Sequence, residues 1–505
     1  EKFGTWPDTK RHVYDDGWLR RFFDALRENQ SWLRTATLAE AVDSNDATGK
    51  IYLPEGSYRE MTEWALPYEK QHAYEDLRHE FHDDPRWDRV QQFVRGGFWR
   101  NFKVRYPDTD DMYTRMLMVS QRIEQASQHG LSDHQLDDAR RELYRGQCNC
   151  SYWHGAFGGA YLPHLRHAVY NHLIAAENLV DEAFGKQGTW IESYANDFNL
   201  DGLAEVRLAN DQLICLLAPH QGGHIYELDV RPICLNLSAS LDRHPEAYHR
   251  KVLAGPSDNE GQVSSIHDRV VFKQAGLDQR VQYDTYRRKS LIDHFYGENQ
   301  GLEAVAAGQA QELGSFVEAP FQAVVRRNPD RCQVKLTHDG HVGDVPVRIT
   351  KGVTLEAGSD TLEIAYLLDG VPNDQPLHFG VEFNFAGLPG GADDRYFATG
   401  DGSHLGNLSQ RLELSDIDQL DLIDEWQGIG LRLTANRPTH FWTFPLESVS
   451  QSEGGFELVQ QSVVVMPRWY VLGDMDGRWS VTMSLKLDTS VAMSRRMEQL
   501  LAATS

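Results

Sequence analysis

The residues best suited to do chemistry lie in one stretch, residues 147–173 (QCNCSYWHGAFGGAYLPHLRHAVYNHL). Tyr152, Trp153 and His154 offer flat faces with polar edges, and the glycines that follow them let a backbone approach a ligand closely. A pyranose ring has apolar C–H faces and a rim of hydroxyls, so a surface of this kind suits a sugar. The same residue types also build tightly packed junctions between a loop and a helix. The residues alone leave both interpretations open.

A second pattern, at residues 197–205 (DFNLDGLAE), is typical of a Ca²⁺-binding loop. Side-chain oxygens stand at loop positions 1, 3, 5 and 9, and a glycine stands at position 6. The expected ligands are four side chains and one main-chain carbonyl: Asp197, Asn199, Asp201 and Glu205, with the carbonyl of Leu203. Leu208 stands where an EF-hand has its last glutamate, so the pattern is closer to Ca²⁺ loops that precede strands. A metal-free turn built on Asp and Asn side chains is the alternative.

The elements expected around these residues change type near residue 188. Helical spacing of apolar residues predicts helices over 18–26, 35–41, 113–128, 132–144 and 163–183. Thr37 with Glu40 and Ser132 with Gln135 fit capping boxes at two of the helix starts. Residues 51–53 predict a short strand. Beyond residue 188, alternating apolar residues predict strands over 205–217, 224–230, 347–355, 361–368, 377–385, 430–434, 441–444 and 480–487.

Composition excludes several classes of partner. The 505 residues include 50 basic and 74 acidic side chains, a net charge of −24, and no basic run stands out. Nucleic acid and anionic membranes both require a basic surface, so we expect neither as a partner. No apolar run approaches the length of a membrane span. Five cysteines without a CxxC pair favour a reducing compartment, and we expect a cytoplasmic protein.

Four motifs in order resemble glycoside hydrolase family 57, the family of the 4-α-glucanotransferases and related α-amylases. They are EKFGTWP at 1–7, IYLPEGSYREMTEWALP at 51–67, GGFWRNFKVRYPDTDDMYTRMLMVS at 96–120 and QCNCSYWHGAFGGAYLPHLR at 147–166. The resemblance covers about the first 175 residues, and the remainder is similar only as a long β-rich tail. It implies an α+β multidomain fold: the remnant of a (β/α) barrel over 1–105, a helical domain over 106–187 and a large all-β sandwich over 188–505.

The resemblance also implies an activity, the cleavage or transfer of α-1,4-glucans with retention. That chemistry requires two carboxylates about 5 Å apart. In the family both precede the first of the four motifs, so no catalytic residue is expected in this chain. Its expected share is contact with an α-glucan or maltooligosaccharide through Trp6 and Trp153 as stacking platforms and His154 as a hydroxyl partner. Cys150 stands where the glucanotransferases have aspartate.

A second class of function fits the same residues. A non-catalytic carbohydrate-binding or structural module would bind glucan without turning it over, and the chain as printed suits that description. An aspartate shortly before Glu1 and a glutamate on an earlier strand would favour the enzyme. The sequence also leaves a homodimer open.

Overall fold

The computed structural model describes residues 8–52, 57, 59–153, 158–255, 271–452 and 454–504. Two compact units divide the chain, residues 1–56 and residues 57–505. Two residues of the predicted site, Trp6 and His154, lie outside the described residues. In the part of the chain that is described, no helix has both the length and the apolar character of a membrane span.

The first unit is helical over residues 8–52. It contains a π-helical turn, Arg11–Asp15, and the helices α1 (Trp18–Glu28) and α2 (Leu38–Ser44). The predicted capping box is confirmed at α2, where the side chains of Thr37 and Glu40 each accept the other's main-chain N–H. Ile51 and Tyr52 do not form the predicted strand. They are 80% and 87% exposed, and in the described residues no neighbouring strand pairs with them.

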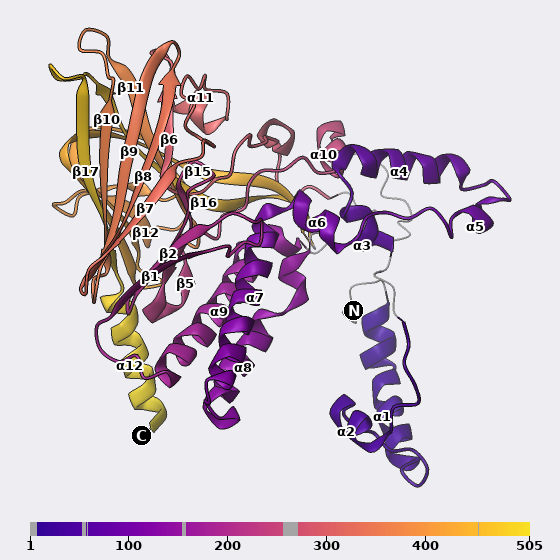
Figure 1. The fold of residues 1–505 in the computed structure, drawn as a ribbon. Coiled ribbons are helices and arrows are strands. Elements are labelled where there is room, and N and C mark those ends of the chain that lie inside the picture. Colours follow the sequence, from indigo (N-terminus) through magenta and orange to yellow (C-terminus); the bar gives the residue numbers. More distant parts are fainter. Residues whose placement is uncertain are drawn as a thin grey trace. The chain divides into compact units, whose positions relative to one another are not determined.

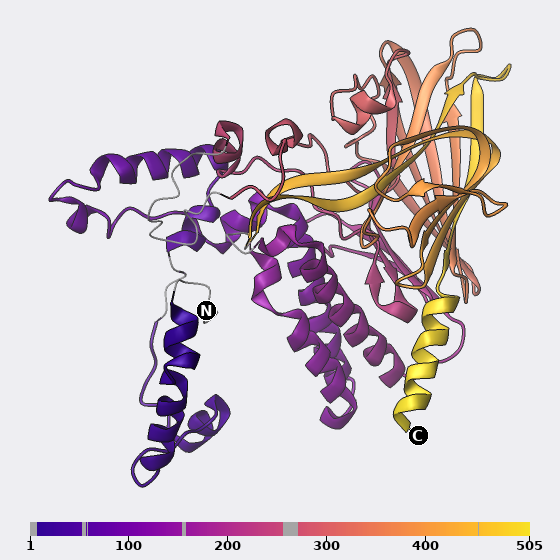
Figure 2. The same cartoon turned by 180° about the vertical axis from the view of Figure 1, so that it is seen from behind.

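The second unit begins with helices: α3 (Arg59–Trp64), α4 (Tyr68–Phe81), α5 (Trp87–Val90), α6 (Trp99–Arg105), α7 (Pro107–Gln128), α8 (Asp133–Gly146) and α9 (Pro163–Ala183). The helices α7, α8 and α9 lie side by side (Figures 1 and 2) around an apolar cluster that includes Val119, Leu136 and Leu173. The helix predicted over 163–183 is confirmed with those bounds, because Pro163 occupies the first turn, where its missing N–H is not needed.

A five-stranded antiparallel sheet follows: β1 (Ile191–Asn196), β2 (Glu205–Asn210), β3 (Leu213–Ala218), β4 (His224–Val230) and β5 (Leu235–Asn236). The run predicted over 205–217 is therefore two strands. The side-chain oxygen of Asn210 accepts the main-chain N–H groups of Gln212 and Leu213, which closes a turn between β2 and β3.

Twelve further strands form one branched antiparallel sheet: β6 (Ile292–Tyr296), β7 (Gln322–Arg327), β8 (Arg331–Val342), β9 (Val345–Glu356), β10 (Thr361–Asp369), β11 (Leu377–Phe385), β12 (Arg395–Ala398), β13 (His404–Asn407), β14 (Leu412–Asp424), β15 (Ile429–Ser452), β16 (Gly455–Val471) and β17 (Arg478–Asp488). One path runs β13-β12-β14-β15-β17-β10-β9-β8-β7, and β16, β11 and β6 branch from it. Short helices α10 (His249–Ala254) and α11 (Leu302–Ala306) and a C-terminal helix α12 (Ser490–Thr504) complete the unit.

The long strand β15 joins the two branches. Its residues 430–435 pair with β17, and its residues 440–452 pair with β16. The two strands predicted over 430–434 and 441–444 are thus parts of one strand. The β15–β16 hairpin reaches toward α10 (Figure 2), where the imidazole of His249 contacts the carbonyl of Val449 at 3.0 Å.

Buried charges line the interface between the helices and the five-stranded sheet. The guanidinium of Arg115 on α7 lies 2.6 Å from Glu177 on α9, 2.6 Å from Glu227 and 3.0 Å from Asp229, both on β4. Arg207 on β2 lies 2.7 Å from Glu177. All five side chains are buried. An isolated buried ion is strongly unfavourable, so this mutual pairing allows the helices to dock on the sheet.

Candidate functional site

Trp153 lies in an aromatic junction with the residues of α6. Its ring centroid is 4.9 Å from that of Trp99 and 4.6 Å from that of Phe102. Its main-chain carbonyl accepts the N–H of Ala160 at 2.6 Å. This hydrogen bond joins two points of the loop that precedes α9. The side chain is half-buried. Packing therefore fixes the indole while part of it stays accessible, an arrangement that suits a stacking platform.

Glu246 is a buried carboxylate that binds three residues next to this junction. Its Oε1 accepts hydrogen bonds from the hydroxyls of Tyr106, at 2.5 Å, and Tyr161, at 2.8 Å, and its Oε2 accepts one from Arg105 at 2.5 Å. Burial raises the pKa of both tyrosines well above the usual value, so both keep their protons. Sequence reasoning missed Glu246, because it lies 85 residues beyond Tyr161 and in no motif.

Arg166 on α9 connects the same loop to the β-rich part of the chain. Its guanidinium donates to the carbonyls of Ala160 and Ala239 and to the side-chain oxygen of Gln461 on β16, the last at 2.8 Å. The amide of Gln461 in turn donates to the carbonyl of Tyr161 at 2.9 Å. Burial lowers the pKa of Arg166 to about 10. The conformation of the loop is therefore held by a strand that lies 295 residues further along the chain.

Cys150 belongs to the same loop, in a one-turn 3₁₀ helix over Asn149–Tyr152. Its exposed thiol contacts the side-chain oxygen of Asn149 at 3.8 Å. Partial burial and the neighbouring Cys148 raise the pKa of Cys150, so the group remains an uncharged thiol near neutral pH. No hydrogen bond or ring contact within the described residues joins Cys150 to Trp153.

The loop at 197–205 folds around its own carboxylates. The carboxylate of Asp197 accepts the N–H groups of Asp201 and Gly202, each at 3.0 Å. The Oε2 of Glu205 accepts the N–H of Phe198 at 2.8 Å. Gly202 has a φ of +89°, the left-handed conformation that the predicted loop requires at its sixth position.

The donor set of this loop fits a calcium ion. The Oε1 of Glu205 is buried and has no hydrogen-bond partner among the described residues. Burial and the charges of Asp201 and Asp197 raise the pKa of Glu205 to about 7, and no Lys or Arg of the described residues pairs with these acids. The sequence did not point to His220, whose Nε2 lies 3.1 Å from Asp201 and 3.6 Å from Glu205. Hard oxygen donors around an unbalanced negative charge are what Ca²⁺ prefers.

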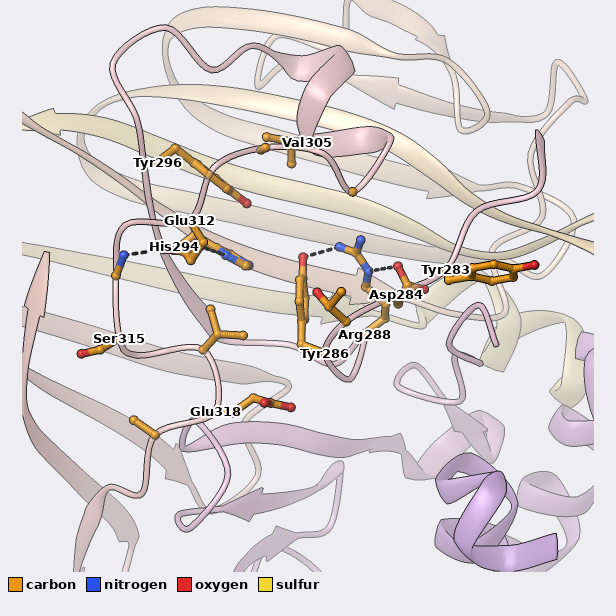
Figure 3. A pocket seen from close by; sticks show the side chains of 16 residues that line it. Tyr283, Asp284, Tyr286, Arg288, His294, Tyr296, Val305, Glu312, Ser315 and Glu318 are labelled. Atoms are coloured by element: carbon orange, nitrogen blue, oxygen red, sulfur yellow. Dashed lines mark hydrogen bonds and ion pairs between the residues drawn. The ribbon is translucent and has the colours of Figure 1, made fainter. Parts of the chain in front are cut away.

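A different pocket, of about 510 Å³, opens beside β6 and the segment before it (Figure 3). His294 lies between Glu312, at 2.7 Å, and Glu382, at 3.3 Å. Burial alone would lower the pKa of His294, but these two carboxylates raise it to about 9. Arg288 pairs with Asp284 and Glu382 at 2.8 and 3.0 Å. All five charged groups are already paired with one another, so they shape the pocket and do not supply a general base.

Comparison with known proteins places the chain in a family. A family model described as "Alpha-amylase/4-alpha-glucanotransferase, C-terminal" matches residues 197–483, and one for the middle domain of the same family matches residues 97–180. The chain belongs to the α-amylase/4-α-glucanotransferase family. The resemblance to glycoside hydrolase family 57 is thereby confirmed, and it extends into the β-rich part that the four motifs do not reach.

Relatives of this family match nearly the whole chain. An "Alpha-amylase 1" of Dictyoglomus thermophilum is 32% identical over 490 residues, which is 95% of this chain and 68% of that protein. A "4-alpha-glucanotransferase" of Thermococcus litoralis is 31% identical over 469 residues, 92% of this chain and 64% of the relative. The crystal structure of 4-α-glucanotransferase from Thermococcus litoralis superposes with a TM-score of 0.69 at 28% identity over 96% of this chain and 66% of that one. The chain thus spans about two thirds of the length of these relatives.

Proposed function

We propose that the intact protein is a cytoplasmic enzyme that acts on α-1,4-glucans with retention, as a glycosidase or a 4-α-glucanotransferase. The observation that carries this proposal is the match over 95% of the chain to a relative named as an α-amylase. A second relative, with nearly the same identity, is named as a 4-α-glucanotransferase. The choice between water and a second sugar as the acceptor therefore remains part of the proposal.

Within the intact protein, we assign these 505 residues a substrate-binding and supporting role. The proposed parts are a barrel remnant over 1–105, a helical domain over 106–187 and a β-sandwich over 188–505. A retaining mechanism requires two carboxylates about 5 Å apart, and the family resemblance assigns both to positions before the first motif. Buried acids such as Glu246 and Glu177 are already bonded to arginine, and Glu246 also to tyrosine. They are poor candidates for either role.

Turnover and binding test this assignment separately. The 505-residue chain alone should leave maltooligosaccharides unchanged, and any redistribution of chain length would contradict the assignment. In the full-length protein, Trp153→Ala should weaken maltooligosaccharide binding by about 1–3 kcal/mol, the range for the loss of an aromatic anchor. Trp32→Ala removes a tryptophan that is 74% exposed in the first unit and serves as the control. Unchanged affinity on calorimetry would assign Trp153 to core packing alone.

The thiol at Cys150 bears on the choice of acceptor. A thiol does not hold or accept a proton near neutral pH as a carboxylate does. We propose that Cys150→Asp in the full-length protein raises the ratio of transfer to hydrolysis, because the resemblance places an aspartate here in the glucanotransferases. A product ratio equal to that of the parent enzyme would remove Cys150 from the site.

We also propose that the loop at 197–205 binds one Ca²⁺ in a structural role. Asp197, Asn199, Asp201 and Glu205 would provide side-chain oxygens and Leu203 its main-chain carbonyl. The buried oxygen of Glu205 that lacks a partner supports this assignment. Bound there, the ion would supply the positive charge that these acids lack and would fix the start of β2.

A further inference from the structure

A pocket of about 500 Å³ lies between the start of α9 and the strands β5, β12 and β16. None of the residues that line it lines the pocket of Figure 3 or belongs to the aromatic junction around Trp153. Its lining includes a histidine of α9, a glycine after β11 and the tryptophan of the β14–β15 turn: His167, Gly387 and Trp426. This pocket has hydrogen-bonding capacity that the protein itself does not use.

The unused capacity belongs to His167. Both of its ring nitrogens are buried, and neither has a hydrogen-bond partner among the described residues. Buried polar atoms of native proteins are nearly always bonded, so two unpartnered nitrogens on a residue that lines a pocket indicate a missing partner. Gly387 is part of this arrangement. It has a φ of +78°, and a Cβ there would lie 2.8 Å from Cε1 of His167, so the glycine allows the backbone to approach the ring.

His167 is suited to a hydroxyl and not to an ion. Burial, together with the charge of Arg166, lowers the pKa of His167 to about 3, so the imidazole is neutral at physiological pH. A neutral imidazole has one N–H donor and one nitrogen acceptor. A hydroxyl group likewise donates one hydrogen bond and accepts others. A ligand with hydroxyls can therefore satisfy both ring nitrogens.

Trp426 supplies an apolar surface at the rim of the pocket. Its side chain is 73% exposed. The turn that carries it is nevertheless fixed, because Arg495 on α12 donates to the carbonyls of Glu425 and Trp426 at 2.8 and 2.9 Å. The amide of Gln427 also donates to the carbonyl of Gly387, which joins this turn to the wall of the pocket. An exposed indole on a fixed backbone can stack on the C–H face of a sugar at little entropic cost.

The remaining lining is close to neutral. Its amide and hydroxyl groups, from Gln460, Gln461 and Ser462, are uncharged and already hydrogen-bonded within the protein. Its guanidinium, Arg395, lies 3.5 Å from Asp424 and 3.9 Å from Asp394, so its charge is already balanced. No carboxylate lines the pocket among the described residues. The described lining therefore has no unpaired arginine or lysine that would bind an anion. It also lacks the two carboxylates that glycoside cleavage requires.

We propose that this pocket binds a pyranose unit of an uncharged carbohydrate, with Trp426 stacked on the ring and His167 exchanging hydrogen bonds with its hydroxyls. The pyranose class follows from the pocket itself. That the unit belongs to an α-glucan chain, and not to a free monosaccharide, rests on the proposed function.

Calorimetric titration of the 505-residue chain tests the proposal, in a Trp153→Ala background that removes one of the other predicted sugar contacts. Maltotriose should bind, and Trp426→Ala and His167→Phe should each weaken it by about tenfold. Trp32→Ala is the control, because Trp32 is as exposed as Trp426, at 74%. Because Trp426 is exposed, its variant is expected to fold, and a melting curve checks both variants.

The relative affinities for maltotriose and glucose distinguish a glucan-chain site from a site for a free sugar. Tighter binding of maltotriose than of glucose supports a glucan chain, and equal binding supports a pocket for a free sugar. No binding of either sugar, or binding that neither Trp426→Ala nor His167→Phe weakens, overturns the proposal. Turnover of maltooligosaccharides by the full-length protein is measured separately. Its absence would contradict the proposed function and leave the binding result standing.

Discussion

Two clusters of acidic side chains each include a residue of β2, Arg207 in one and Glu205 in the other, and are balanced in opposite ways. Glu205 and Arg207 are two residues apart on β2 and therefore face the same side of the sheet. Around Arg115 and Arg207, the buried acids Glu177, Glu227 and Asp229 pair with arginines of the chain itself. Around Glu205, the one basic side chain among the described residues that pairs with the loop at 197–205 is His220, which contacts Asp201 and Glu205. The first cluster is complete without a ligand, whereas the second fits a cation from solution.

One acid from each cluster, Glu177 and Glu205, shows the contrast in its pKa. Burial alone would raise the pKa of Glu177, but the surrounding arginines outweigh burial and hold it well below the usual value. For Glu205, burial and then the neighbouring Asp201 and Asp197 raise the pKa to about 7. Glu177 and Glu205 thus differ in pKa because arginines surround Glu177, whereas carboxylates lie next to Glu205. The predictions below test this difference, from the largest expected effect to the smallest.

Removing the central cation of the first cluster should have the largest effect. Arg115→Met leaves Glu177, Glu227 and Asp229 buried with too little positive charge, and the free energy of unfolding should fall by about 3–5 kcal/mol. Urea denaturation measures it. Arg141→Met is the matched control, because Arg141 pairs with Asp138 on the surface of α8 and should change stability by less than about 1 kcal/mol. Equal effects of the two substitutions would contradict the comparison.

Supplying the cation of the second cluster should have an intermediate effect. If the loop binds Ca²⁺, the free energy of unfolding should rise by about 2.7 kcal/mol at a hundredfold excess over the dissociation constant. Melting curves with EDTA, with Ca²⁺ and with Mg²⁺ measure this, and Mg²⁺ should substitute poorly because it prefers a smaller octahedral shell. Asp201→Ala should abolish the response. A midpoint that chelation does not move would make the loop an ordinary Asx turn.

Replacing a carboxylate that is already protonated should have the smallest effect. Burial, and then the neighbouring Asp229, raise the pKa of Glu227 well above its usual value. Glu227→Gln resembles the protonated form and should change the free energy of unfolding by less than about 1 kcal/mol near pH 5.

The same substitution should alter the pH dependence. Because the folded-state pKa of Glu227 is raised, its contribution to stability is fully present below its unfolded pKa, about 4.3, and is lost as pH rises toward the folded-state value. Wild type should therefore lose stability relative to Glu227→Gln as the pH rises from 5 toward the folded-state pKa of Glu227. Parallel pH profiles from urea denaturation would show that Glu227 is charged at pH 5.

Local features of the fold could be predicted from the sequence. The helix α9 and the strands β4 and β11 have their predicted bounds, because their periodicity is clear and Pro163 marks the helix start. The capping box of Ser132 and Gln135 is confirmed at α8. In each case the information lies within a few neighbouring residues.

Features that depend on distant residues could not be predicted. His164 and His167 share a helix face, and polar histidines on such a face are usually solvated, but Gly387 closes over His167 from 220 positions away. The partners of the second acidic cluster follow the same pattern, since His220 lies outside the loop motif. The predicted strand at residues 51–53 fails at Ile51 and Tyr52 because alternation alone does not provide a pairing partner.

Arg166 has a consequence for anyone who exchanges parts between members of this family. Its guanidinium is held by carbonyls of Ala160 and Ala239 and by the side chain of Gln461. A chimera that took the helices from one relative and the strands from another would keep this arginine and could lose the side chain of Gln461, whereas the carbonyl at position 239 is present in any residue. Positions 166 and 461 should therefore be exchanged together, although they lie 295 residues apart.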